Sequence, residues 1–223
     1  MHWHYAQEKR QGILDNLLIF GGTFDPIHQG HLNVAENIQK HFRFQRFIFL
    51  PCKLPVHKEK ATANSTQRIE MLKLALADYP GCRFEIDDCE IRRQSPSYMV
   101  TTLESYRKDL GMDISITLLM GMDSFYQLPL WHRWTRILEL ANLLVIKRPD
   151  ISLPVEDNVL ETLSGHVTDR EEDLKNNAQG IIYFFDAGSY PISSTEIRRN
   201  SLQNSEAIPE AVLMYITENK LYS

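Results

Sequence analysis

The hydrophobic positions of this chain fall into two alternating patterns. Short apolar runs of strand length recur along the sequence, and between the first five of them lie stretches with apolar residues at helical spacing. The apolar runs span residues 17–20, 47–50, 84–86, 114–120, 143–146 and 181–185, and the helical stretches span 32–42, 67–77, 98–110 and 134–140. Strands that alternate with helices predict crossover units, and hence a mainly parallel sheet covered by helices on both faces.

The last third of the chain carries a different pattern. Residues 150–173 hold eight acidic residues against one basic residue, Arg170, which is typical of a solvated excursion rather than a metal-binding cage. Pro209 suits the first position of a helix. The helical pattern then continues through Val212, Leu213, Ile216 and Lys220-Leu221. We therefore expect an α/β domain that ends in a helical segment.

Composition narrows the class of protein. The 223 residues suit one sizeable domain, and 43% hydrophobic with 24% charged residues is ordinary for a soluble globular protein. A net charge of −5 gives no electrostatic footprint for nucleic acid, and no apolar run approaches the roughly 20 residues that span a bilayer. The three cysteines form no Cys-x-x-Cys pair, so a reducing cytoplasm fits best. Residues 1–15 lack an apolar stretch and are interpreted as a polar extension rather than a signal peptide.

The first predicted strand runs directly into a glycine turn and a helix start. Gly21 and Gly22 have no Cβ, so the backbone can approach a ligand closely, and the helix start beyond them leaves N–H groups unpaired. Such a site binds anions, most often phosphate. His28 and His31 are three residues apart and face the same way on a first helical turn, so both can donate to one phosphate. An isolated pair would more simply be core or surface histidines, but this setting favours a phosphate site.

A second helix start follows the last predicted strand, at residues 192–199. Ser193 or Ser194 can cap it, and Arg198, one turn further along, can reach a phosphate with a planar fork of donors. Taken alone, this pattern is equally that of an ordinary cap followed by a solvated basic turn. Because ligands bind beyond the carboxyl ends of parallel strands, we expect the segments after four strands to converge on one site. These segments begin at Gly21, Pro51, Gly121 and Lys147.

These motifs together resemble those of a known superfamily. The run from Gly21 to His31, with its two glycines, Thr-Phe-Asp-Pro and His-x-Gly-His, resembles the signature of the nucleotidylyltransferases. The segment from Ser194 to Arg198 is similar to their second element, which holds the phosphates of ATP. From residue 17 to 222 the chain resembles, more narrowly, the bacterial nicotinate mononucleotide adenylyltransferases. The supporting segments are 51–58, 96–98, 121–124, 130–131 and 147–149.

The resemblance implies a Rossmann-like three-layer α/β fold in one domain, residues 16–223, and a set of site residues. The implied catalytic residues are His28, His31 and Arg198. The implied ATP-binding residues are Gly21, Gly22, Thr23, Phe24, Gly30, Ser194 and Thr195. The implied mononucleotide-binding residues are His57, Lys58, Ser97, Tyr98, Met99, Asp123, Trp131 and Arg148. Mg²⁺ is expected to arrive with ATP, and no metal site of the protein's own is expected.

The residues implied to bind the mononucleotide can each make a specific interaction with it. Trp131 presents a flat face on which a pyridine ring can stack, although a tryptophan can equally be plain core. Asp123 can accept from ribose hydroxyls or cap the next helix, and His57, Lys58 and Arg148 are candidate phosphate donors. Ser97 and Tyr98 open a helix whose N–H groups can hold a carboxylate. Met99 stands where relatives often have threonine, so recognition of the acid group would rest on backbone N–H groups. 

The expected reaction joins nicotinate mononucleotide to ATP and releases pyrophosphate. Three alternatives stay open: an enzyme that prefers the amide substrate, a phosphopantetheine adenylyltransferase, and a nucleotide-sensing module without turnover. The presence of both histidines argues against the last. The partners expected are the two substrates, with neither nucleic acid nor membrane, and the oligomeric state is not predicted.

Overall fold

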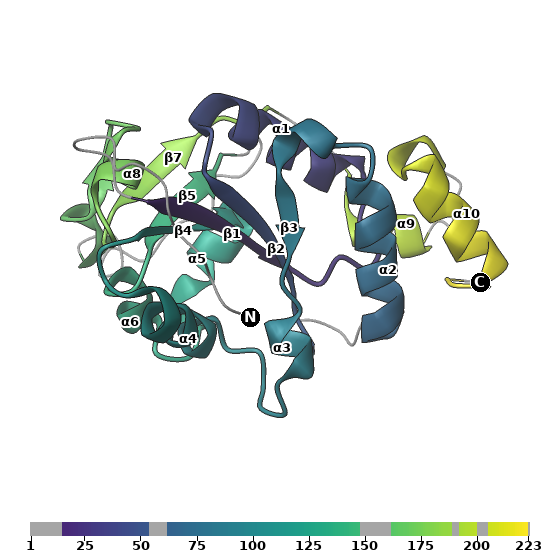
Figure 1. The fold of residues 1–223 in the computed structure, drawn as a ribbon, viewed down its shortest axis with the longest axis horizontal. Helices are drawn as coiled ribbons and strands as arrows, with labels where there is room; N and C mark the ends of the chain where they lie inside the picture. Colours follow the sequence, from purple (N-terminus) through teal and green to yellow (C-terminus); the bar gives the residue numbers. More distant parts are fainter. Residues whose placement is uncertain (1–14, 54–61, 148–161, 189–191, 200–204, 223) are drawn as a thin grey trace.

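The computed structural model describes residues 15–53, 62–147, 162–188, 192–199 and 205–222 (Figure 1). Within these ranges the strands form one seven-stranded sheet in which every neighbouring pair is parallel. The strands are β1 (Asn16–Gly22), β2 (Arg46–Pro51), β3 (Phe84–Ile86), β4 (Ser115–Gly121), β5 (Asn142–Ile146), β6 (Val167–Thr168) and β7 (Ile182–Phe185). Their order is β3-β2-β1-β4-β5-β7-β6.

The strand order reverses at β1, which pairs with β2 on one side and with β4 on the other. From β1 the chain proceeds outward to β2 and β3, and then returns to add β4 and β5 on the opposite edge. A crevice at the carboxyl ends of the strands is expected at such a switch point, and it is the usual place for a ligand in this architecture. The glycine turn that follows β1 lies at this position.

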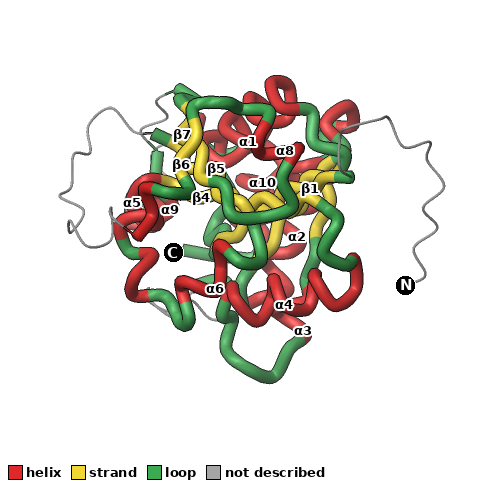
Figure 2. The backbone as a smooth tube through the Cα atoms, turned by 90° about the vertical axis from the view of Figure 1, so that its left-hand side faces the viewer, coloured by secondary structure: helices red, strands yellow, loops and turns green. Residues whose placement is uncertain are grey.

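Helices cover both faces of the sheet, as Figure 2 shows for α1 and α8 on one side and α4 and α6 on the other. The helices are α1 (Gln29–Phe42), α2 (Ser65–Leu76), α3 (Cys89–Arg92), α4 (Met99–Leu110), α5 (Met122–Tyr126), α6 (Trp134–Leu138), α8 (Asp173–Asn176), α9 (Ser194–Arg199) and α10 (Glu210–Glu218). Short 3-10 turns span Pro80–Cys82, Leu128–Leu130 and Ser205–Ala207.

The core divides into two layers because successive strand residues point to opposite faces of the sheet. In β1, Leu18 joins the buried cluster that includes α1, α2 and α10, whereas Leu17 and Ile19 join the cluster that includes α4 and α6. In β2, Phe47 and Phe49 belong to the first cluster. The expected Rossmann-like three-layer fold with a mainly parallel sheet is therefore confirmed.

The six expected strands and four expected helices are all present, with differences at their ends. Helix α1 begins at Gln29 with His28 as its N-cap, in agreement with the first turn expected at the two histidines, and its apolar spacing begins at Leu32. The C-terminal helix has Pro209 as its N-cap rather than its first residue, and it ends at Glu218. The expected continuation to 220–221 is wrong: Lys220 has a φ of 49°, which a helix does not accommodate.

The acidic stretch is largely exposed where the structure describes it, and it also contains regular structure. Residues 150–161 lie outside the described ranges, but the remainder contains β6 and α8. Asp169, Glu171 and Glu172 are exposed, so this acidic part is solvated as expected, whereas Leu163 is buried in the core. Leu174 of α8, directly after the stretch, is fully buried. The expected extension, residues 1–15, lies outside the described ranges except for Asp15. Among the described residues, no helix has both the length and the apolar character that crossing a bilayer requires.

Candidate active site

The two histidines of the first motif stack on each other at the start of α1. His28 is the N-cap, with extended backbone, and His31 lies on the first turn, where its N–H donates to the His28 carbonyl at 2.9 Å. Their ring centroids are 3.7 Å apart, with 34° between the ring planes. His28 is buried and His31 is half-buried. The two imidazoles therefore face the same way, as expected, beside a helix start that favours negative charge.

The glycine turn is packed too tightly for side chains. A Cβ on Gly22 would lie 2.9 Å from the Phe24 ring, and a Cβ on Gly30 would lie 3.0 Å from Nδ1 of His28. Phe24 is buried and its ring packs edge-on against His31, with centroids 5.2 Å apart. The Phe24 side chain therefore packs in the core against His31, so only the backbone of this residue can meet a ligand. Close approach of a phosphate to this turn is possible because two of its residues have no Cβ.

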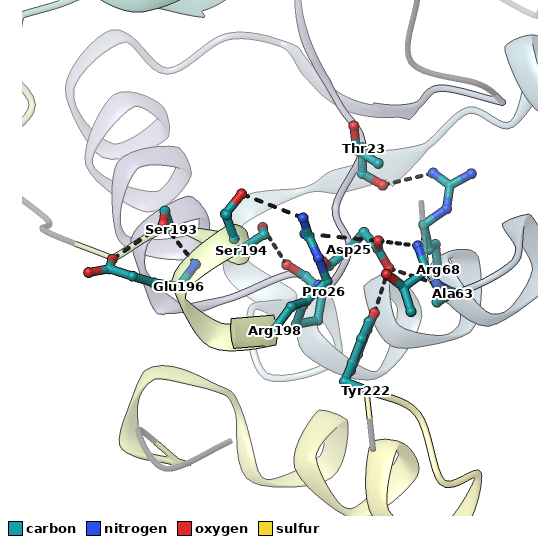
Figure 3. Close-up of polar contacts among 12 residues, drawn as sticks. Thr23, Asp25, Pro26, Ala63, Arg68, Ser193, Ser194, Glu196, Arg198 and Tyr222 are labelled. Atoms are coloured by element: carbon teal, nitrogen blue, oxygen red, sulfur yellow. Dashed lines mark hydrogen bonds and ion pairs between the residues drawn. The ribbon is translucent and has the colours of Figure 1, made fainter. Parts of the chain in front are cut away.

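The second motif lies directly beside the first. Ser193 caps α9 by accepting the N–H of Glu196 at 3.2 Å, so of the two expected capping residues it is Ser193 that caps the helix. The hydroxyl of Ser194 donates instead to the carbonyl of Pro26 at 3.0 Å, which joins the start of α9 to the turn after the glycines (Figure 3). Thr195 is exposed on the same first turn. The two predicted phosphate elements are thus brought together although they are more than 160 residues apart in sequence.

Arg198 is held against the same turn. Its Nη1 donates to the carbonyl of Asp25 at 2.8 Å and lies 3.9 Å from Oδ2 of that residue. Its Nη2 lies 3.5 Å from Oγ1 of Thr195. The side chain remains 22% exposed, so part of the guanidinium faces outward from the turn. The arrangement fixes the arginine beside α9 while leaving donors for a ligand.

Asp25 joins several segments around the site, a role that the sequence patterns did not reveal. It is buried, and its carboxylate accepts the N–H groups of Thr62, at 2.7 Å, and Ala63, at 3.0 Å, which precede α2. Together with Arg198, these contacts tie two segments, the residues before α2 and helix α9, to the turn after β1 (Figure 3). The carboxylate is acceptor-only when ionised, so a buried position demands donors of this kind. In the sequence Asp25 is one residue of the first motif, and nothing there indicates that it is buried.

Arg68 is a second buried positioning residue that the patterns missed. It is 1% exposed, and Nη1 donates to the carbonyl of Thr23 at 2.7 Å while Nη2 donates to the carbonyl of Lys53 at 3.2 Å. It thereby joins the glycine turn to the end of β2. In the sequence it occupies an ordinary polar position of a predicted helix, and no local signal marks it as buried.

The expected carboxylate-binding helix start lies next to the glycine turn. Helix α4 begins at Met99, with Tyr98 as N-cap, and a Cβ on Gly21 would lie 3.0 Å from the Met99 methyl group. The Tyr98 ring packs over His132, with centroids 4.5 Å apart. Trp131, the neighbour of that histidine, is half-buried and borders the same core cluster as Tyr98 and Met99. The structure thus gathers these predicted mononucleotide residues beside the first phosphate element.

The hydroxyl of Ser97 is already occupied. It accepts the N–H of Lys53 at 3.0 Å and donates to the buried carboxyl of Glu90, which also accepts from Thr102 at 2.6 Å. Burial raises the pKa of Glu90. This acidic group comes from α3, so the sequence of the segment around Ser97 does not indicate it. With Ser97 engaged and Met99 lacking a hydroxyl, the backbone N–H groups at the start of α4 are the donors left for an acid group.

The remaining predicted residues are placed less closely. Asp123 is the second residue of α5, directly after β4, so it lies at the carboxyl edge of the sheet, and it is half-buried. A Cβ on Gly121, the preceding N-cap, would meet no atom within 4 Å, so the space there is open. His57, Lys58 and Arg148 lie outside the described residues.

The chemistry of the site is that of an anion receptor. Its polar groups include imidazoles, a guanidinium and two helix starts, which are the kinds of group that can donate hydrogen bonds to phosphate oxygens. Asp25 is engaged by its own donors. Among the described residues, no group of three or more His, Cys, Asp or Glu side chains is arranged to hold a metal ion.

Comparison with known proteins agrees with this geometry. The cytidylyltransferase-like family model matches residues 19–200. The chain is 44% identical over 213 residues, 94% of this chain and 100% of the relative, to the "Probable nicotinate-nucleotide adenylyltransferase" of Legionella pneumophila (strain Lens). It is 38% identical over 208 residues, 92% of this chain and 98% of the relative, to the protein of the same name from Methylococcus capsulatus.

A solved structure is similar in fold. It is the "Plasmodium falciparum nicotinic acid mononucleotide adenylyltransferase complexed with NaAD", with a TM-score of 0.70 over 93% of this chain and 97% of that one. At 18% sequence identity, this likeness concerns the fold alone. The family match and the sequence relatives cover nearly the whole described site. The chain therefore belongs to the cytidylyltransferase-like family and, within it, to the nicotinate-nucleotide adenylyltransferases.

Proposed function

We propose that the protein transfers the adenylyl group of ATP to nicotinate mononucleotide, giving nicotinate adenine dinucleotide and pyrophosphate. The observation that carries the proposal is the stack of His28 and His31 at the start of α1, with the start of α9 joined to the same turn by the bond from Ser194 to Pro26. Two helix starts beside one glycine turn support a phosphate site. The names of the close relatives support the same reaction.

The reaction requires alignment more than proton transfer. A phosphate monoester has a second pKa near 6, so the mononucleotide phosphate is mostly dianionic at neutral pH. One of its oxygens bonds to the α-phosphorus of ATP, and the bond from that phosphorus to the β-phosphate oxygen breaks, so that pyrophosphate leaves with the electron pair. No general base is needed, and the protein contributes positioning and neutralisation of charge.

Each element of the site has a role in this scheme. His28 and His31 donate to the α-phosphate and the departing pyrophosphate, where negative charge grows in the transition state. Arg198 and the start of α9, at Ser194 and Thr195, hold the outer phosphates. The backbone of the glycine turn forms the cradle. Mg²⁺ enters as part of the substrate, on phosphate oxygens and water.

The mononucleotide occupies the α4 side of the turn in this proposal. The pyridine ring stacks on Trp131, and its carboxylate accepts N–H groups at the start of α4. Asp123 accepts from the ribose hydroxyls, and His57, Lys58 and Arg148 remain predicted donors to the phosphate. Because a carboxamide brings an NH₂ group where the site offers donors, we expect the acid to be preferred by at least about tenfold in kcat/KM.

Turnover with a panel of acceptors tests the proposal. Purified protein is given Mg²⁺-ATP with nicotinate mononucleotide, nicotinamide mononucleotide or phosphopantetheine in parallel, and pyrophosphate release is followed together with the dinucleotide product. The proposal expects rapid turnover with the first acceptor. Preference for the amide would contradict the acid assignment, preference for phosphopantetheine would replace the acceptor, and ATP binding without turnover with any of the three would indicate a binding module.

A further inference from the structure

Residues after α10 contact Asp25, in the turn between β1 and α1. Helix α10 packs against α2 and ends at Glu218, after which the N–H of Leu221 donates to the carbonyl of Ile216 at 3.0 Å (Figure 1). Tyr222 has a φ of 62°, which turns the chain. Its hydroxyl donates to Oδ1 of Asp25 at 2.6 Å, across 197 positions of sequence (Figure 3).

Tyr222 and Arg198 meet the same buried residue from different sides. The tyrosine hydroxyl bonds Oδ1 of Asp25, while Nη1 of Arg198 donates to the carbonyl of Asp25 at 2.8 Å and lies 3.9 Å from Oδ2. Oδ1 also accepts the N–H of Ala63 and Oδ2 the N–H of Thr62. The orientation of this carboxylate therefore decides how closely it approaches the arginine.

The tyrosine is well suited to fix that orientation. Burial and the neighbouring carboxylate both raise the pKa of Tyr222, so the hydroxyl remains a proton donor at neutral pH. A hydrogen bond from a hydroxyl to an ionised carboxylate is among the stronger kinds, and Asp25 is too deeply buried for bulk water to replace it readily. Without the hydroxyl, the carboxylate can turn toward Arg198 and shorten the 3.9 Å separation, which competes with the phosphates for the guanidinium.

We propose that Tyr222 is a positioning residue for adenylyl transfer: its hydroxyl holds the Asp25 carboxylate in place, so that Arg198 stays directed at the phosphates of ATP. The inference rests on the proposed function, in which Arg198 binds those phosphates. In this role Tyr222 supports the phosphate site through Asp25 and not by binding the substrate itself.

Removal of one hydroxyl tests this role. The variant is Tyr222→Phe, and the matched control is Tyr215→Phe, which removes a hydroxyl from half-buried Tyr215 of α10. We expect Tyr222→Phe to lower kcat by about tenfold, as for a small misplacement of a catalytic group, with KM for the mononucleotide changed by less than about twofold. Tyr215→Phe should match the wild type. A wild-type kcat in Tyr222→Phe would overturn the inference.

A double variant separates positioning from mere structural support. In an Arg198→Met background, adding Tyr222→Phe should change kcat by less than about twofold, because the hydroxyl acts through an arginine that is no longer there. Multiplicative losses would overturn the inference and indicate a structural role. All kcat values are taken per folded molecule, with the folded fraction from circular dichroism, so reduced stability does not obscure the comparison. Failure of the wild type to turn over would instead refute the proposed function.

Discussion

Substitution of Gly30 by alanine is the sharpest structural test of the histidine stack. Gly30 lies on the first turn of α1, and a Cβ there would be 3.0 Å from Nδ1 and 3.1 Å from Cε1 of His28. Ordinary van der Waals contact begins at 3.4 Å, so the imidazole must move by about 0.4 Å. The His31 ring, 3.7 Å away, and Ile192, whose Cβ would lie 3.6 Å from the new methyl group, limit where it can go.

The displacement gives the size of the effect. A misplacement of about 1 Å at a catalytic group can cost roughly 100-fold in rate, so about 0.4 Å corresponds to a five- to tenfold loss of kcat. Stability should change little. Alanine in place of glycine favours a helix by about 0.5–1 kcal/mol, and crowding a packed site costs about as much. The expected result for Gly30→Ala is therefore a slower enzyme with a melting temperature near that of the wild type.

The assay compares Gly30→Ala with Gly81→Ala by pyrophosphate release at saturating substrates and by thermal unfolding. Gly81 is exposed, and a Cβ on it would meet no atom within 4 Å, so the control should behave as wild type in both measurements. A kcat for Gly30→Ala within about twofold of the wild type would refute the reasoning, because the position of His28 would then not limit the reaction.

Three further substitutions test other parts of the structure. Trp131→Ala should raise KM for the mononucleotide about fivefold, with KM for ATP unchanged, since about 1 kcal/mol of stacking is lost; an equal rise in both would place Trp131 in the core. Arg68→Met should lower the free energy of unfolding in urea by about 2–4 kcal/mol, because two carbonyls lose their buried donor; a loss below about 1 kcal/mol would contradict this. Tyr106 donates to Asp87 at 2.6 Å, and burial with that carboxylate raises its pKa above the ordinary 10.0. The contribution of Tyr106 to the free energy of unfolding is complete below about pH 10 and falls above it, because the tyrosine ionises in the unfolded chain but not in the folded one. In Tyr106→Phe, the free energy of unfolding should therefore fall less steeply with pH between about pH 10 and 11 than in the wild type. The same steepness in both proteins would contradict the assignment.

The sequence predicted the sheet well because its central strands are buried on both faces. β5, for example, is fully buried and reads as a continuous apolar run between polar residues. β6 was missed because two residues at an edge carry no period, and Val167 within it is exposed. The apolar spacing alone would start α1 at Leu32, and it is the glycine turn with its two histidines that indicates the true start near residue 29.

In the candidate site, too, the residues that the sequence predicted belong to local patterns, and those that it missed depend on contacts between distant segments. His28 and His31 could be singled out because the pattern that indicates them is local: a strand followed by a glycine turn and a helix. Asp25 and Tyr222 were not, because their roles arise from contacts across 38 and 197 positions of sequence. A buried polar residue is recognisable only once its partners are known, and those partners are backbone groups of distant loops.

The central claim is that the histidine stack stabilises charge that grows during adenylyl transfer. The most direct measurement compares kcat with the dissociation constant of ATP in His28→Ala and His31→Ala. Donors aimed at the transition state contribute more there than in the bound ground state. We expect kcat to fall by about 10²- to 10³-fold in each variant, with the dissociation constant of ATP changed by less than about threefold. Wild-type turnover in either variant, or a loss of ATP affinity as large as the loss of kcat, would contradict the account.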